Sequence, residues 1–520
     1  MLKNFGTAKS IFSLFFILML IFGQTAFAQD DKKPEKKEEK TEKTAEQKAE
    51  EQKKIEKREE KQAKKEEKEA KKEAQIEVKN PAKGRLPVII IPGLIGSELI
   101  NKNTKEKVWF DLGRSKDDDL RLPISPNLKN NRDNLVPGDI LRKIQLVRLT
   151  PEIEIYQKLI DTLRVDGFTE GKFDEPKAGD DADTFYVFAY DWRLDNVENA
   201  QNLLTKIDAV RTKLNRPDLK FNIIAHSMGG LIARYAAMYG KADLSTRNPR
   251  PTWKGNSYIN SISMVATPNS GALSSLDSLL NGFSLFGSGK LNLPFIQNLS
   301  KYDLFTIPSV YQLLPHTGTV RAFDENLKPI KIDVLNPATW EKYGWTAFTD
   351  EDFAKKFTAE EQRQAKSYFN AALLRAKLFH SALDASPSVK SPIAMFYLGA
   401  ECRPTIDGMI IRKDAKKNVW KTEFGTTSYE KANGEKVTKE QTEAVLLTPG
   451  DGVVPKRSLI ASFLKLGRLR NIDSSVLVGG EGEACSEHNR LTGNEIVTKN
   501  LLDVLNNRSL EGATTAKNEK

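Results

Sequence analysis

A serine in a tight turn between a strand and a helix is the first residue whose setting points to chemistry. Ser227 lies in the run Ala225-His226-Ser227-Met228-Gly229, after an apolar strand expected at 221–225 and before a helix. Such a turn requires small residues two positions before and two positions after the serine, as found here. The turn would raise the Ser227 hydroxyl above the sheet, and the helix N-terminus would offer N–H donors to a developing oxyanion. The segment predicts a nucleophilic serine, unless it is a chance match in a strand–helix corner.

A serine nucleophile needs a general base, and the chain contains only four histidines. In this type of site the chain order is serine, acid, histidine. His488 lies between the last predicted strand, 476–478, and a helix expected at 495–505, so it is the base by elimination. We expect a packing role for His226, beside the nucleophile, and a surface or capping role for His316 and His380.

The acid that orients the imidazole is expected in the loop after the penultimate strand. Asp451 lies there between two glycines, far enough before His488 to leave room for a helix and a strand. Its carboxylate would hold the tautomer of His488 and stabilise the imidazolium. Asp407 and Glu401 also follow that strand, and a glycine-flanked aspartate can simply form a turn, so these alternatives stay open.

An oxyanion hole needs a second N–H donor, usually from the loop after an early strand. The run Pro92-Gly93-Leu94-Ile95-Gly96 follows the first core strand, 88–91. The backbone N–H groups of Leu94 and Met228 are therefore the candidate oxyanion donors. The glycines also close a turn, which is compatible with this role.

Short apolar strands that alternate with amphipathic helices must position these residues. From residue 81 onward we expect strands at 88–91, 185–190, 221–225, 259–266, 393–398 and 476–478, and helices near 151–165 and 196–214. This pattern predicts an α/β fold with a mostly parallel central sheet covered on both faces. Together with the serine turn, it predicts an α/β-hydrolase spanning 81–505, with a large lid inserted at about 272–390. A smaller insertion, at about 403–448, contains Asn433-Gly434, which is typical of a hairpin.

The ends of the chain differ in composition from this domain. Residues 1–28 have the charged, apolar and small-residue regions of a signal peptide, and an uncleaved membrane anchor is the alternative. Residues 29–80 are rich in Lys and Glu and lack the apolar residues of a core, so a solvated helix and a disordered spacer are both expected alternatives. Residues 506–520 are expected to form a disordered tail. We expect an exported protein that is periplasmic, secreted or associated with an outer membrane.

Composition excludes several classes of function. The net charge of +10 is spread over 520 residues, and the one dense lysine run is interleaved with Glu, so nucleic-acid binding is not expected. Two cysteines exclude a disulfide scaffold. The histidines lack the spacing of metal ligands and no phosphate-binding loop is present, so we expect no metal and no cofactor.

Five segments occur in the same order as in a known family. They are the segment 87–99, the run Tyr190-Asp191-Trp192-Arg193, the Ser227 turn, the segment 308–315 and the segment 450–455. The chain resembles the lecithin:cholesterol acyltransferase family, including lysosomal phospholipase A2 and phospholipid:diacylglycerol acyltransferase, in islands across residues 86–505. The resemblance implies the same catalytic set of Ser227, Asp451 and His488, with Leu94 and Met228 as oxyanion donors. It also implies a phospholipid or other acyl lipid as substrate and partner.

The resemblance places a lipid-surface loop near Trp109 and Phe110, although the cysteines that close this loop in the family are missing. Lipid attachment could instead lie in the apolar stretch 279–295, which contains Phe283 and Phe286. These four aromatic residues are candidates for peripheral membrane contact, and lid packing is the alternative. Asp191 and Arg193 are expected to form a structural ion pair.

The two cysteines each follow a strand expected to be a neighbour of the other in the sheet. In an exported protein this favours a disulfide between Cys402 and Cys485, with two unpaired thiols as the alternative.

The sequence thus predicts an exported serine lipase, phospholipase or acyltransferase that works through an acyl-enzyme. A neutral-lipid lipase or a short-chain carboxylesterase is the alternative within the enzymes. A catalytically silent envelope-associated binding protein is the alternative outside them, but it has no chemical reason to keep serine, acid and base in order.

Overall fold

A computed structural model describes residues 84–110, 120–144, 153–176, 181–283, 298–389, 391–414, 418–461, 474–478 and 486–508, with scattered positions between 50 and 68. The chain divides into two units, residues 1–53 and 54–520. The expected signal peptide, and most of the expected spacer and tail, lie outside the described residues. Within the described residues, no helix combines the length and apolar character needed to cross a bilayer.

The core of the second unit is a sheet of seven parallel strands, in the order β20-β13-β10-β9-β1-β8-β7. In chain order the strands are β1 (Val88–Ile91), β7 (Thr169–Gly171), β8 (Thr184–Val187), β9 (Phe221–His226), β10 (Ile259–Val265), β13 (Ala394–Ala400) and β20 (Ser474–Val478). The six predicted strands are confirmed, although β8 ends three residues early. The edge strand β7 was missed because its Thr-Glu-Gly sequence has no apolar run.

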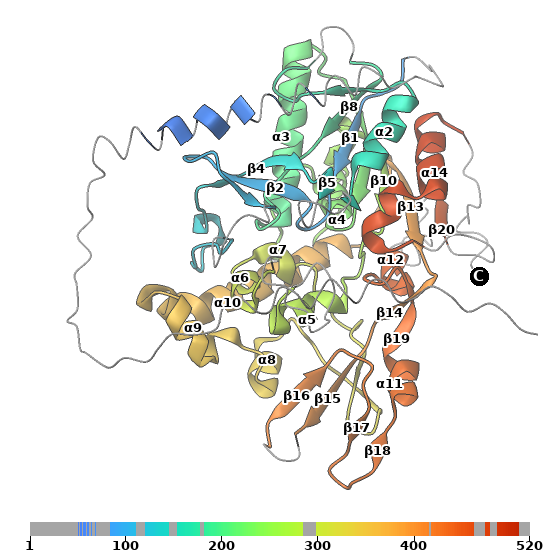
Figure 1. The fold of residues 1–520 in the computed structure, drawn as a ribbon. Coiled ribbons are helices and arrows are strands. Elements are labelled where there is room, and N and C mark those ends of the chain that lie inside the picture. Colours follow the sequence, from blue (N-terminus) through green and yellow to red (C-terminus); the bar gives the residue numbers. More distant parts are fainter. Residues whose placement is uncertain are drawn as a thin grey trace, which may run out of the picture. The chain divides into compact units, whose positions relative to one another are not determined.

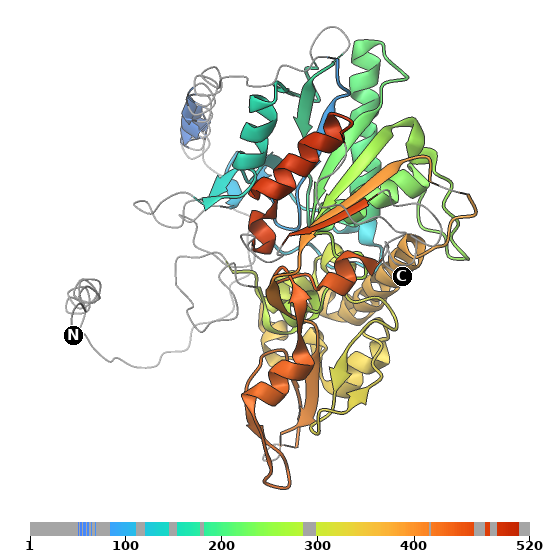
Figure 2. The ribbon, with the colours of Figure 1, turned by 90° about the vertical axis from the view of Figure 1, so that its right-hand side faces the viewer.

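Helices cover both faces of this sheet, which is why its central strands are rich in apolar residues. In β1, Ile89 and Ile91 belong to one buried cluster, and Val88 and Ile90 belong to a second. The first cluster includes α3 (Asn196–Leu214) and α4 (Met228–Tyr239), and the second includes α2 (Gln157–Val165) and α14 (Glu495–Leu505). Figures 1 and 2 show α2 and α14 on the opposite side of the sheet from α3. The architecture is an α/β-hydrolase fold, as predicted.

The helix expected near 151–165 begins later than predicted. Residues Ile153–Glu154 form β6, which pairs with β5 (Lys143–Ile144). The helix α2 starts only at Gln157.

Two insertions follow β10 and β13. The first contains α5 (Leu273–Asn281), α6 (Lys301–Phe305), α7 (Pro308–Tyr311), β11 (Ala322–Phe323), β12 (Pro329–Ile330), α8 (Pro337–Tyr343), α9 (Glu351–Lys356) and α10 (Ala359–Leu383). The second contains β14 (Arg403–Ile406), β15 (Met409–Lys413), β16 (Trp420–Glu423), β17 (Tyr429–Glu430), β18 (Lys436–Val437) and α11 (Lys439–Leu446), and leads into β19 (Leu447–Gly450).

The two insertions form one structure rather than two. Strand β11 of the first pairs in parallel with β15 of the second, which gives a sheet ordered β12-β11-β15-β16. This long-range pairing leaves no local sequence signal. The hairpin expected at Asn433-Gly434 is confirmed, because β17 and β18 pair antiparallel and Gly434 has a φ of +84°.

A smaller sheet, β3-β2-β4, contains one of the four aromatic residues assigned to membrane contact. Its strands are β2 (Ser97–Asn101), β3 (Lys107–Trp109) and β4 (Leu135–Ile140). Trp109 is fully buried, its Nε1 donates to the carbonyl of Ile95 at 2.8 Å, and its ring lies 5.6 Å from that of Trp192. The assignment of Trp109 to a membrane surface is therefore wrong.

The prediction of membrane contact stands differently for the other three aromatic residues. Phe110 and Phe283 are partly buried against the main core, so their contact with a membrane stays a prediction. Phe286 lies outside the described residues.

The Tyr190-Asp191-Trp192-Arg193 run ties the small sheet to the main one. Arg193 is fully buried and donates to Asp191 Oδ2 at 2.8 Å and to both carboxylate oxygens of Asp133, at 2.6 and 2.9 Å. Burial works to lower the pKa of this guanidinium, but the two carboxylates outweigh it and hold the pKa above its ordinary value. The expected structural ion pair is confirmed and extended by Asp133.

We expect Arg193→Ala to destabilise the protein by about 3 kcal/mol, because it leaves two carboxylates with little water and no counter-ion. The matched control is Arg216→Ala, which breaks an exposed pair with Asp218 and should change stability by less than about 0.5 kcal/mol. Urea unfolding of both variants measures the difference. Equal losses would contradict a structural role for the buried network.

Candidate active site

The backbone at Ser227 forms the sharp corner that the sequence predicts. Ser227 has φ 52° and ψ −125°, between the end of β9 and the first residue of α4. A positive φ is unfavourable for a residue with a side chain and persists only where the surroundings enforce it. The Ser227 N–H donates to the carbonyl of Val265 at 2.8 Å, which anchors the corner to β10.

The glycines after the serine allow the helix to lie against its neighbours. A Cβ on Gly229 would come within 2.5 Å of the carbonyl oxygen of Pro92, and one on Gly230 within 2.0 Å of Thr267 Oγ1. Neither contact is sterically possible, so the start of α4 can approach the loop after β1 only with glycine at 229, and the segment after β10 only with glycine at 230.

The structure brings the three residues of the predicted triad into one hydrogen-bonded chain. His488 Nε2 lies 2.9 Å from Ser227 Oγ, and His488 Nδ1 lies 2.8 Å from Asp451 Oδ2. The other carboxylate oxygen of Asp451 accepts the N–H groups of Val453 and Val454, at 3.0 and 2.7 Å. These bonds aim Oδ2 at the imidazole. The arrangement suits transfer of the serine proton to Nε2.

Other carboxylates that the sequence left open as the acid have other partners. Asp407 is buried and accepts from Arg457 at 2.6 Å, and Arg321 also lies beside it. Glu401 forms an ion pair with Lys456. Only Asp451, of these three, contacts the imidazole in the structure.

The loop after β1 lies directly against the nucleophile. The N–H of Gly96 donates to the carbonyl of Gly93 at 3.1 Å and closes a turn. The N–H of Leu94 takes no part in this hydrogen bond. A Cβ on Gly93 would lie 2.9 Å from Ser227 Cβ. Met228 is the first residue of α4, so its N–H has no partner within the helix. Both proposed oxyanion donors thus belong to segments that border Ser227, and their role stays a prediction.

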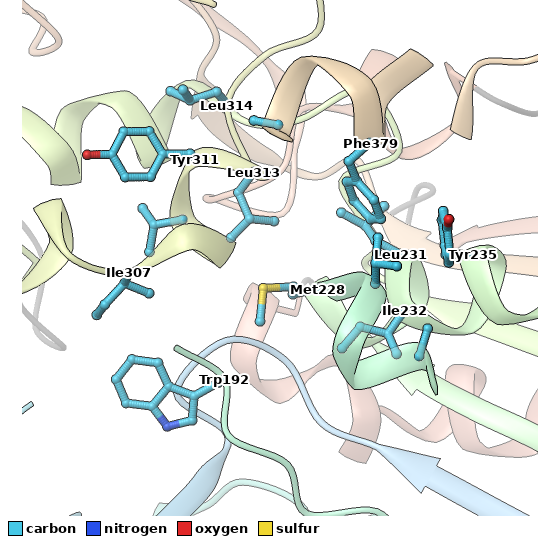
Figure 3. Packing of buried hydrophobic residues seen from close by; sticks show 14 of the residues in the cluster. Trp192, Met228, Leu231, Ile232, Tyr235, Ile307, Tyr311, Leu313, Leu314 and Phe379 are labelled. Carbon is cyan, nitrogen blue, oxygen red and sulfur yellow. The ribbon is translucent and has the colours of Figure 1, made fainter. Parts of the chain in front are cut away.

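Apolar side chains from the first insertion surround the start of α4. In the view of Figure 3, Leu313, Ile307 and Trp192 lie around Met228. All four are buried members of the main core cluster. Ser227 itself is partly exposed. Packed apolar side chains therefore border Ser227 on the side of α4.

His226 does more than pack, because both of its ring nitrogens have polar partners. One partner, Tyr156, was not identified from the sequence. His226 Nδ1 lies 2.8 Å from Tyr156 Oη, and its Nε2 lies 3.1 Å from the carbonyl oxygen of His488. Burial, followed by the nearby His488, lowers the pKa of His226 to about 3. Tyr156 belongs to no motif and precedes a helix in a region of ordinary sequence, so no local signal could have singled it out.

The other two histidines are buried, so the surface role expected for them is wrong, whereas the capping role fits His380, which contacts the carbonyl of Gln312, the C-cap residue of α7. Their rings stack with centroids 3.9 Å apart, and His316 Nδ1 lies 2.9 Å from Asp384 Oδ2. His380 Nε2 lies 2.8 Å from the carbonyl oxygen of Gln312, and burial lowers the pKa of His380 well below its ordinary value. They join α10 to the segment after α7.

Cys402 is disulfide-bonded. The chain contains one other cysteine, Cys485, which lies outside the described residues. Among the residues that the structure describes, no group of three or more His, Cys, Asp or Glu side chains is placed to hold a metal ion.

The low pKa of His226 predicts a pH dependence of stability. In the unfolded chain this histidine binds a proton below about pH 6.5, but in the folded protein only near pH 3, so its contribution to stability is lost as the pH falls below 6.5. Replacement by glutamine, which does not titrate, should make the unfolding free energy less dependent on pH by about 1.4 kcal/mol per pH unit between pH 6 and 4. Urea unfolding at pH 4, 5, 6 and 7 measures both profiles, and parallel profiles would contradict the burial of a neutral imidazole.

Comparison with known proteins gives the same fold. A chain in the structure entitled "The crystal structure of Tle4-Tli4 complex" aligns with 82% of this chain and 99% of its own length, at 14% identity and a TM-score of 0.51. At this identity the likeness concerns the fold alone.

Two sequence comparisons concern the family. Lecithin-cholesterol acyltransferase-like 4 of Arabidopsis thaliana is 25% identical over 253 residues, which are 44% of this chain and 42% of the plant protein. The match thus spans less than half the length of that relative. The sequence profile of lecithin:cholesterol acyltransferase matches residues 150–461, more than half of the chain and a range that includes Ser227 and Asp451. The resemblance inferred from the motifs is confirmed, and the chain belongs to the lecithin:cholesterol acyltransferase family.

Proposed function

We propose that this protein is an exported serine esterase that cleaves or transfers the acyl groups of lipids. The observation that carries the proposal is the hydrogen-bonded chain from Ser227 through His488 to Asp451, with distances of 2.9 and 2.8 Å. Family membership supports acyl lipids, with phospholipids first, as the substrate class.

The first half of the reaction forms an acyl-enzyme. Ser227 Oγ attacks the ester carbonyl carbon while its proton passes to His488 Nε2, and Asp451 stabilises the imidazolium. The N–H groups of Leu94 and Met228 would stabilise the oxyanion. The bond to the alcohol oxygen then breaks, His488 returns the proton to that oxygen, and the acyl group remains on Ser227.

The second half decides between hydrolysis and transfer. Water or an acceptor alcohol gives its proton to His488 and attacks the acyl carbon. The bond to Ser227 Oγ then breaks, His488 returns the proton to Oγ, and a fatty acid or a new ester is released. A neutral-lipid lipase or a short-chain carboxylesterase would use the same residues, so the substrate must separate these alternatives.

Export is part of the proposal, and the signal-like residues 1–28 support it. We expect the mature chain, isolated from the periplasm, the outer membrane or the medium of a bacterial culture, to begin at residue 29. N-terminal sequencing checks this. An intact Met1 in the exported fraction, or protein retained in the cytoplasm, would contradict it.

We expect the purified protein to react with a fluorophosphonate probe, because this probe traps activated serines. Ser227→Ala should abolish labelling, and Asp451→Asn should lower kcat by roughly 10³–10⁴-fold. The control is Ser381→Ala, which removes an exposed hydroxyl on α10. Equal labelling of the Ser227→Ala variant and the unmodified protein would contradict the enzyme proposal and favour a silent binding protein.

The same preparations, incubated with vesicles of mixed phospholipids and triacylglycerols, identify the substrate by lipid mass spectrometry. We expect the unmodified protein to produce lysophospholipid and the Ser227→Ala variant to produce none. Loss of triacylglycerol alone would favour the neutral-lipid lipase. Turnover of p-nitrophenyl butyrate with neither lipid consumed would favour the carboxylesterase.

A further inference from the structure

A chain of three hydrogen bonds runs behind the triad and joins four segments that are far apart in the sequence. The N–H of Gly93 donates to Tyr156 Oη at 2.9 Å. Tyr156 Oη lies 2.8 Å from His226 Nδ1, and His226 Nε2 lies 3.1 Å from the carbonyl oxygen of His488. Tyr156 and His226 are both buried, 2% and 6% exposed, so water does not compete for these bonds.

The chemistry of the groups fixes the direction of each bond. A carbonyl oxygen only accepts, so His226 Nε2 must carry a proton and donate to His488. The imidazole of His226 is neutral, so its Nδ1 accepts the hydroxyl proton of Tyr156. The hydroxyl oxygen of Tyr156 then accepts from Gly93. Each bond polarises the next in the same direction, from the Gly93 loop to the backbone of His488.

One end of this chain holds the general base. The backbone N–H of His488 donates to the carbonyl of Asp451 at 3.0 Å, and its carbonyl accepts from His226. The backbone of His488 is thus fixed on both sides of its Cα atom. The imidazole can bridge Ser227 and Asp451 only while this backbone stays in place.

The other end holds the loop that carries a predicted oxyanion donor. Gly93 directly precedes Leu94, and Tyr156 holds the Gly93 N–H. The carbonyl oxygens of Pro92 and Gly93 accept from Tyr190 Oη, at 2.9 and 3.2 Å. The loop is therefore held from both sides by tyrosine hydroxyl groups.

We infer that Tyr156 and His226 are positioning residues that set His488 and the Leu94 loop relative to Ser227. The inference rests on the proposed function and extends it. Neither side chain needs to touch the substrate. A neutral ring at position 226 also suits the charge that forms during the reaction, because the His226 and His488 rings are centred 5.0 Å apart and a cation at 226 would oppose the imidazolium.

The test compares two buried tyrosines that each lose one hydroxyl group. Tyr156→Phe breaks the chain, while Tyr239→Phe breaks a bond of 2.8 Å to the carbonyl of Ala382 at the far end of α4. With p-nitrophenyl butyrate, Tyr156→Phe should lower kcat roughly 10- to 100-fold and change KM by less than about two-fold. Tyr239→Phe should keep the unmodified kcat, and both should lower the melting temperature by similar amounts.

A second pair of variants tests the bond to His488 directly. The amide of glutamine can donate to the carbonyl of His488, whereas leucine cannot. His226→Gln should therefore retain a kcat several-fold higher than His226→Leu, and the rate of fluorophosphonate labelling should follow the same order. This pair decides the question if Tyr156→Phe does not fold.

The outcomes separate this inference from the proposed function. An unmodified protein that neither labels nor turns over esters would overturn both. An active protein that loses activity in Ser227→Ala, but keeps its kcat in Tyr156→Phe or has equal kcat in His226→Gln and His226→Leu, would overturn the positioning role alone.

Discussion

A serine held at φ 52° requires surroundings that leave it no alternative, and the rest of the site depends on this constraint. The unfavourable backbone costs about 1–3 kcal/mol. Packing offsets it: β10 accepts the Ser227 N–H, and α4 fits against the loop after β1 through Gly229. A chain that lacked β10, α4 or this loop would have no reason to keep the corner. The corner at Ser227 is therefore a product of the assembled sheet rather than of its own five-residue motif.

The parallel sheet explains how residues so far apart in the chain meet. Ser227 and His488 are 261 positions apart, yet they are hydrogen-bonded. Strands β1, β9 and β20 all run in the same direction, so the segments that follow them leave at the same edge of the sheet. Those segments carry the Leu94 loop, Ser227 and His488 in turn. Asp451 reaches the same edge after the second insertion, at the end of β19.

The parts that could be predicted from sequence are those with a local signal. The serine turn lies between an apolar strand and glycines, His488 was one of four histidines, and the core strands are runs of apolar residues. Errors arose where the outcome depends on distant partners. Tryptophan is a residue type common at lipid surfaces, but the indole of Trp109 donates to a backbone carbonyl and packs against a second tryptophan in the core. The joint sheet of the two insertions and the contact of Tyr156 with His226 are pairings between remote segments, which no local pattern encodes.

The insertion that the sequence marks as a lid is in large part core. Tyr311, Leu314 and Phe379 come from this insertion, are fully buried, and belong to the same cluster as Leu231 of α4. Figure 3 shows Phe379 beside Leu231. Each such side chain contributes roughly 1.5–3 kcal/mol of burial, so removing these three from the core would cost about 4.5–9 kcal/mol, which is comparable with the whole stability of about 5–15 kcal/mol of a typical domain. The same packing that keeps Ser227 at its corner holds these two helices in place. We therefore expect α7 and α10 to stay part of the scaffold around Ser227, and any opening for the proposed substrate to involve parts of the insertion that do not share this core.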